Sequence, residues 1–189
     1  MPSGEGASDG ARRIGYLNMR TFIDTSDPNL RNAFANFRAQ GVTEVIVDLR
    51  YNGGGLVSIA ELMGDLLGGD KAGQVFSFTT FRPSKSNENE TDLFQSQPQS
   101  IAATKIAFIG TGGTASASEL VINSFIPYLG NNMALVGTDT FGKPVGQIAI
   151  DKQPAVMIDL HGYVNGTLIE PTTPPHGENY EYDLFLKNT

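Results

Sequence analysis

Residues 110–119 (GTGGTASASE) place serines in a loop of small residues that follows a buried strand and leads into a helix. Small side chains let the backbone turn tightly and leave its N–H groups free to face a ligand, and the helix N-terminus adds partial positive charge there. A serine at this point suits an acyl-transfer nucleophile, because the developing oxyanion would be stabilised beside it. On this loop alone, simple helix capping by Ser or Thr remains the stronger interpretation.

Residues 47–55 (VDLRYNGGG) end a second strand in a glycine turn. Ligands gather at the carboxyl ends of parallel strands, so this turn and the serine loop could share one edge of a sheet. Glycine N–H groups there could supply an oxyanion donor. The alternative is a plain turn, with Asp48 paired to Arg50 rather than serving in a triad.

Residues 140–147 (TFGKPVGQ) follow a third strand and carry Lys143. A lysine can accept the proton of a serine only in its uncharged form, which burial and neighbouring dipoles must favour. A single lysine beside glycine is ordinarily a solvated surface residue. The specific signal is therefore the occurrence of all three segments in this order.

The remaining pattern predicts an α/β fold in which strands alternate with helices. We expect a single domain over residues 14–189, preceded by a flexible leader over residues 1–13. The polar stretch 83–100 is predicted to be a surface loop, and Asn165-Gly166 a hairpin turn. The strands are expected at 14–22, 42–49, 74–81, 106–109, 134–137, 145–150, 156–160 and 163–169, and the helices at 28–40, 57–67 and after residue 119.

Composition narrows the class of protein. The chain has 189 residues, 40% of them hydrophobic, which is enough for one globular core. A net charge of −7 with only 13 Lys and Arg argues against a nucleic-acid partner. The chain has no cysteine, which excludes thiolate chemistry, and no apolar run of membrane-spanning length. Residues 1–13 are not expected to be a signal peptide, because they have no apolar core. The two histidines, His161 and His176, lack metal-ligand spacing and are expected to be surface or packing residues.

The three segments together, as DLRxNxGG, TASASE and TFGKxxxQ after the strand IGYLNMRTF, resemble the C-terminal processing peptidases, also called tail-specific proteases. The resemblance covers roughly residues 14–148. It implies a ClpP/crotonase-like core, in which a β-sheet with α/β crossover units is flanked by helices. It also implies a serine endopeptidase that cleaves proteins near their C-termini without a metal or organic cofactor.

The resemblance further implies the roles of particular residues. Ser116 would be the nucleophile, Lys143 its general base, and Gln147 would help to hold the lysine. The N–H groups of Gly55 and Ala117 would form the oxyanion hole, with Gly54 as the alternative to Gly55. Ser118 and Glu119 occupy motif positions without assigned chemistry, and Ser118 is expected to be structural.

Two departures from the family keep other functions open. A PDZ domain usually precedes the first strand, and the spacing from Ser116 to Lys143 is slightly longer than expected. The alternatives are therefore a non-proteolytic binding or scaffold module on the same fold, or a core that is inactive without its PDZ domain. The expected partner is a protein or peptide substrate, and the resemblance implies a periplasmic or cell-envelope location.

Overall fold

The computed structural model describes residues 13–143 and several short strands beyond them. The main elements are β1 (Ile14–Asn18), α1 (Asp27–Ala39), β2 (Glu44–Asp48), α2 (Val57–Leu67), β3 (Val75–Thr80), β4 (Glu90–Leu93), β5 (Lys105–Gly110), α3 (Ala117–Leu129) and β6 (Met133–Gly137). Three 3-10 helices, η1 (Asp24–Ser26), η2 (Pro83–Glu88) and η3 (Gly130–Asn132), join some of them. The short strands are β7 (Gly146–Ile148), β8 (Val156–Ile158), β9 (Tyr163–Val164), β10 (Thr167–Leu168) and β11 (Phe185–Leu186).

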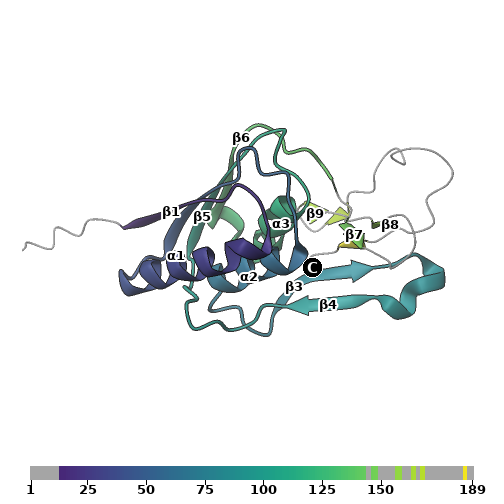
Figure 1. Cartoon of the computed structure of the whole chain (residues 1–189), viewed down its shortest axis with the longest axis horizontal. Coiled ribbons are helices and arrows are strands. Elements are labelled where there is room, and N and C mark those ends of the chain that lie inside the picture. The colour runs from purple at the N-terminus through teal and green to yellow at the C-terminus, as the bar shows by residue number, and fades with distance from the viewer. Residues whose placement is uncertain are drawn as a thin grey trace, which may run out of the picture.

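The central element is a parallel four-stranded sheet in the order β1-β2-β5-β6. Each connection between neighbours passes through a helix, and each step moves in the same direction across the sheet. Because such crossovers are right-handed, all three helices are placed on one face. In Figure 1, α1 and α2 lie side by side along the sheet, and the hairpin of β3 and β4 projects beyond them.

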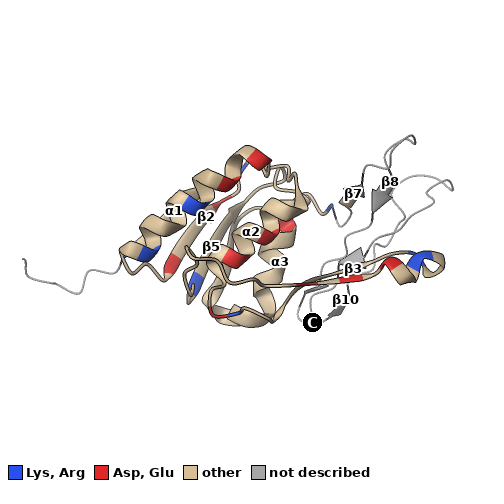
Figure 2. Cartoon of the chain, turned by 60° about the horizontal axis from the view of Figure 1, so that its bottom comes forward, with Lys and Arg blue, Asp and Glu red and all other residues tan. Residues whose placement is uncertain are grey.

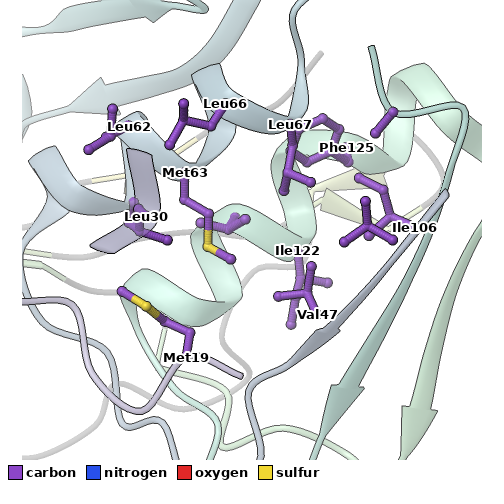
Figure 3. Close-up of a cluster of buried hydrophobic side chains, with 14 of the residues drawn as sticks. Met19, Leu30, Val47, Leu62, Met63, Leu66, Leu67, Ile106, Ile122 and Phe125 are labelled. Carbon is purple, nitrogen blue, oxygen red and sulfur yellow. The ribbon is translucent and has the colours of Figure 1, made fainter. Parts of the chain in front are cut away.

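The hydrophobic core lies between this sheet face and the helices. Val45 and Val47 of β2 are in register with Ile106 and Phe108 of β5, and all four side chains are buried. Figure 3 shows the helical side of this core, where α2 contributes several of the labelled side chains and α3 contributes Ile122 and Phe125. Burying such side chains stabilises the fold by about 1.5–3 kcal/mol each.

The two faces of the strand β2 are buried to different extents. Its burial alternates, because Val45 and Val47 face the helices whereas Ile46 points to the other face and is only partly buried. On that face Ile46 is in register with Tyr16, which is 55% exposed. Among the described residues, β2 is thus fully covered on the side of the helices and only partly covered on the other side.

The polar stretch 83–100 is not a structureless loop. It contains η2 and the strand β4, which pairs antiparallel with β3. Phe94 is fully buried, and its ring contacts those of Phe76, Phe125 and Tyr128 at centroid distances of 5.2, 5.5 and 5.6 Å. The buried Phe94 ring thus holds the segment 83–100 against the core. The other residues of this segment are mostly polar and exposed, so its sequence shows no strand periodicity.

The short strands agree with part of the predicted C-terminal pattern. β7 pairs antiparallel with β8, and β9 pairs antiparallel with β10, with Val164 opposite Thr167 as a two-residue hairpin requires. β11 pairs antiparallel with β3. His161 and His176 lie outside the described residues. No helix in the described part of the chain is long and apolar enough to cross a membrane.

Figure 2 shows charged residues along α1 and near the far end of the β3–β4 hairpin, whereas a few charged residues are buried. The acidic residues of α2 face β4 and the segment that follows it. Asp65 accepts hydrogen bonds from the Gln95 N–H (2.6 Å) and the Gln97 side chain (3.1 Å). Glu61 is half-buried, and burial, reinforced by the charges of Asp92, Asp65 and Glu90, raises its pKa to about 7.

We predict that Glu61→Gln stabilises the protein at neutral and alkaline pH. Below about pH 4.5 the carboxyl group is neutral in both the folded and the unfolded chain, so its ionisation does not lower the free energy of unfolding. As the pH rises toward 7, the unfolded chain ionises first and the wild type loses stability. The variant should therefore gain on the order of 1 kcal/mol at pH 8, after allowing for solvent screening, and almost nothing at pH 4.

Thermal unfolding at the two pH values measures this difference. Asp24→Asn, which removes an exposed carboxylate at the start of η1, is the control and should show no such pH dependence. If Glu61→Gln stabilises the protein equally at pH 4 and pH 8, the pKa of Glu61 is not raised in the folded protein.

Candidate active site

The loops that follow β1, β2, β5 and β6 meet at the carboxyl edge of the sheet. Main-chain hydrogen bonds join neighbouring loops directly. The Met19 N–H donates to the carbonyl of Asp48 (3.0 Å), the Leu49 N–H to that of Ile109 (2.9 Å), and the Thr138 N–H to that of Gly110 (3.2 Å). The glycine turn and the serine loop therefore share one edge, as expected from their positions after parallel strands, and the loop that carries Lys143 lies at the same edge.

Ser116 is the N-cap of α3 and is held in a strained conformation. Its φ of 57° and ψ of −119° are unusual for a residue with a side chain, and it is 9% exposed. Such conformations cost about 1–3 kcal/mol and persist where the surroundings enforce them, commonly at functional sites. Nearby, the Thr114 hydroxyl donates to the carbonyl of Leu49 (2.8 Å) and accepts from the Thr111 N–H (3.0 Å), which fixes the loop before the serine.

The glycine turn lies directly against Ser116. Gly54 has a φ of +101°, and a Cβ there would lie 2.7 Å from the Cβ of Ser116. Gly55 has a φ of +139°, and a Cβ there would lie 2.1 Å from the carbonyl oxygen of Phe22. Both positions require glycine for conformation and for space. The turn can approach the serine only because these side chains are absent.

The N–H groups of the turn differ in their partners. The Gly54 N–H donates to the side-chain oxygen of Asn52 (3.0 Å). Within the described part of the chain, neither the Gly55 N–H nor the Ala117 N–H donates to a backbone carbonyl. Of the two glycines considered for an oxyanion hole, Gly55 is thus the one whose donor remains available.

Glu119 connects the serine loop to the lysine loop. One carboxylate oxygen accepts from the N–H groups of Ser116 (2.8 Å) and Lys143 (2.9 Å). The other accepts from the Thr140 hydroxyl (2.6 Å) and the Gly142 N–H (2.7 Å). The backbones of Ser116 and Lys143 therefore lie within two hydrogen-bond lengths of each other, on either side of one carboxylate that is itself only 9% exposed.

The remaining residues singled out in the sequence are Lys143, Gln147 and Ser118. The Lys143 side chain is half-buried. Gln147 belongs to β7, opposite Met157 of β8, and its side chain is outside the described part of the structure. Ser118 is buried and donates its hydroxyl to the carbonyl of Asn52 (2.9 Å), which agrees with the structural role expected of it.

Asp48 and Arg50 form a structural ion pair rather than part of a catalytic triad. The Arg50 guanidinium donates to both carboxylate oxygens of Asp48, the shortest contact being 2.8 Å, and the Tyr16 hydroxyl donates to the same carboxylate (2.7 Å). The hydrogen bonds from Arg50 hold the pKa of Asp48 well below its usual range, although burial acts in the opposite direction. Among the described residues, no group of three or more acidic or histidine side chains is arranged to hold a metal ion.

The importance of Glu119 was not predicted from the sequence. A glutamate three residues after a helix N-cap commonly accepts the N-cap N–H, and the pattern Ser-x-x-Glu gives that half of its role. Its bonds to Thr140, Gly142 and Lys143 depend on a long-range approach between two loops, for which the sequence carries no local signal.

These features define an α/β protein with a small-residue loop, a glycine turn and a lysine loop assembled at the carboxyl edge of a parallel sheet. The chain belongs to peptidase family S41, whose profile matches residues 13–167. The predicted fold class, an α/β core of the ClpP/crotonase type, is confirmed by this membership and by the similarity to solved S41 structures.

Curated relatives and a solved structure give the extent of the similarity. The chain is 27% identical over 145 residues to the chloroplastic C-terminal processing peptidase of Tetradesmus obliquus, covering 74% of this chain and 28% of that protein. It is 27% identical over 190 aligned positions to a "Probable CtpA-like serine protease" of Staphylococcus aureus, covering 94% of this chain and 36% of that protein. A crystal structure of a candidate S41 protease from Bacteroides fragilis superposes with a TM-score of 0.67 at 27% identity, covering 79% of this chain and 41% of the other.

The chain therefore spans about a third of the length of the curated relatives that it matches.

The two adjacent glycines Gly53 and Gly54 offer a matched test of the close approach to Ser116. We predict that Gly54→Ala destabilises the protein by about 2–5 kcal/mol, because the added methyl group combines left-handed backbone strain with overpacking. Gly53→Ala should change stability by less than about 0.5 kcal/mol, because nothing lies within 4 Å of its added Cβ and its φ is not positive. Chemical denaturation measures both, and equal effects would contradict the described packing of the turn.

Proposed function

We propose that this chain is the catalytic core of a serine endopeptidase in which Ser116 is the nucleophile and Lys143 its general base. The observation that carries the proposal is the shared carboxylate of Glu119, which holds the two residues side by side through their backbones. The strained backbone of Ser116 supports it further, because it marks a residue whose conformation is imposed by its surroundings.

The proposed reaction proceeds through an acyl-enzyme. Uncharged Lys143 accepts the proton of the Ser116 hydroxyl as the serine oxygen attacks the carbonyl carbon of a peptide bond. The resulting oxyanion receives hydrogen bonds from the N–H groups of Gly55 and Ala117. The lysine then gives its proton to the leaving amine. In the second half of the reaction it takes a proton from a water molecule as the water oxygen attacks the acyl carbon, and it returns this proton to the Ser116 oxygen as the ester bond breaks. Gln147 is proposed to hold the lysine in place.

The names of the relatives suggest the substrate class. One is a C-terminal processing peptidase and another a CtpA-like serine protease, so we propose that proteins or peptides are cut near their C-termini. A location in the cell envelope belongs to the same proposal.

We predict that a fluorophosphonate probe labels the wild type and that Ser116→Ala abolishes the labelling. Hydrolysis of casein, a disordered substrate, should be lost in the same variant. Labelling without casein cleavage would show a formed site in a core that needs a further domain to process proteins. Labelling that persists in Ser116→Ala would refute the assignment of the nucleophile.

We predict that Lys143→Ala lowers the labelling rate by about 10²- to 10⁴-fold without unfolding the protein, because the serine loses its proton acceptor. The wild-type rate should rise toward alkaline pH, since only the uncharged amine acts as a base. Lys105→Ala is the control, because Lys105 is half exposed at the start of β5 and far along the strand from the site. A wild-type profile that levels off near pH 6.5, as a histidine would produce, counts against a lysine base.

We predict that Glu119→Gln lowers the labelling rate by about 10- to 100-fold. The amide replaces one acceptor oxygen with a donor NH₂ group, so two of the four groups that donate to Glu119 lose their acceptor, and the serine and lysine loops separate. Glu88→Gln, at the far end of the β3–β4 hairpin, makes the same chemical change outside the site and should label like the wild type. A Glu119→Gln protein that is folded and labels at the wild-type rate would show that the carboxylate is not needed to position these loops.

A further inference from the structure

Asn52 is a fully buried polar residue in the turn between β2 and α2. A buried amide must find partners for both its NH₂ group and its oxygen, or it destabilises the fold. Here the NH₂ group donates to the carbonyl of Met19 (3.0 Å), and the oxygen accepts from the Gly54 N–H (3.0 Å). The side chain therefore joins the loop after β1 to the glycine turn.

The main chain of Asn52 makes a second set of contacts. Its carbonyl accepts from the Ala115 N–H (3.1 Å) and from the Ser118 hydroxyl (2.9 Å). These two residues flank Ser116 and Ala117. Asn52 is thus bonded to the serine loop through its backbone and to the glycine turn through its side chain.

The two sets of contacts meet where the turn touches Ser116. Gly54 packs on the serine, and its N–H is already occupied by the Asn52 oxygen. Because that bond orients the peptide before Gly54, it also sets the direction of the chain into Gly55. Of Gly54 and Gly55, only Gly55 keeps an N–H without an acceptor in the described part of the chain, and its position relative to Ser116 depends on this bond.

We propose that Asn52 is the positioning residue of the oxyanion hole: its side chain holds the Gly55 N–H in place beside the nucleophile. This inference rests on the proposed peptidase function, because it assigns the residue to the transition state of that reaction. Asparagine meets both requirements, since it provides a donor for the Met19 carbonyl and an acceptor for the Gly54 N–H. Aspartate keeps the acceptor but, when ionised, has no donor for Met19.

The test is the rate constant of fluorophosphonate labelling, measured separately from the final labelled fraction. In this reaction the serine oxygen forms a bond to phosphorus, fluoride leaves, and the serine proton passes to the base, while the phosphoryl oxygen requires the same donors as a peptide oxyanion. A residue that only stabilises the fold changes the labelled fraction or the melting temperature. A residue that positions the hole changes the rate constant of the folded protein.

We expect Asn52→Ala to lower the rate constant by about 10- to 100-fold while the final labelled fraction is unchanged. Asn52→Asp should fall between this variant and the wild type, because it keeps the acceptor for the Gly54 N–H. Ser124→Ala is the matched control, since Ser124 is buried and donates its hydroxyl to the Val121 carbonyl (2.8 Å) within α3, and it should label at the wild-type rate.

Four results would overturn the inference. A folded Asn52→Ala protein with the wild-type rate constant removes the role of Asn52 and leaves the proposed peptidase function intact. A smaller labelled fraction at an unchanged rate constant reduces Asn52 to a stabilising residue. Absence of labelling in the wild type refutes the proposed function and this inference together. If Asn52→Ala does not fold, Asn52→Leu decides, because leucine has a similar shape and lacks both hydrogen-bonding groups; a wild-type rate constant in that variant contradicts the role.

Discussion

The arrangement of the site depends on one buried carboxylate that accepts four hydrogen bonds. Glu119 extends from the first turn of α3 and receives donors from the serine loop on one side and from the lysine loop on the other. A buried carboxylate destabilises the fold unless its oxygens accept hydrogen bonds that replace those of water. Glu119 and the two loops therefore depend on each other. The donors of the two loops stabilise the buried charge of Glu119, and the hydrogen bonds to this charge hold the two loops together.

The parallel sheet supplies the setting for this interaction. Its strands bring the loops to one edge, and the right-handed crossovers leave the helices on one face, so α3 begins at that edge, directly after Ser116. The hairpin of β3 and β4 is fastened to α3 through the Phe94 ring and the hydrogen bond from the Tyr128 hydroxyl to the Val75 carbonyl (2.6 Å). The helix that follows Ser116 is therefore supported at both its start and its end.

Much of this organisation could be predicted from the sequence, because it depends on local patterns. The helix over 57–67 and the parallel strands follow from periodicity, and the ion pair of Asp48 with Arg50 follows from their proximity at a strand end. The strand β4 was missed because its residues are polar and its anchor, Phe94, lies just beyond it. The four bonds of Glu119 and the side-chain contacts of Asn52 were also missed, since each joins segments far apart in the chain and no spacing rule encodes such contacts.

Several hydrogen bonds between the loops are made by peptide groups alone. The contacts Met19 to Asp48, Leu49 to Ile109, Ala115 to Asn52 and Phe141 to Thr114 need only an N–H and a carbonyl, which nearly every amino acid supplies. The amino acids at these positions can therefore change while the hydrogen bonds between the loops remain. This helps to explain why the chain shares a fold with relatives to which it is only 27% identical. Proline is the exception: lacking the N–H, it would be excluded from positions 19, 49, 115 and 141 even where many other replacements are tolerated.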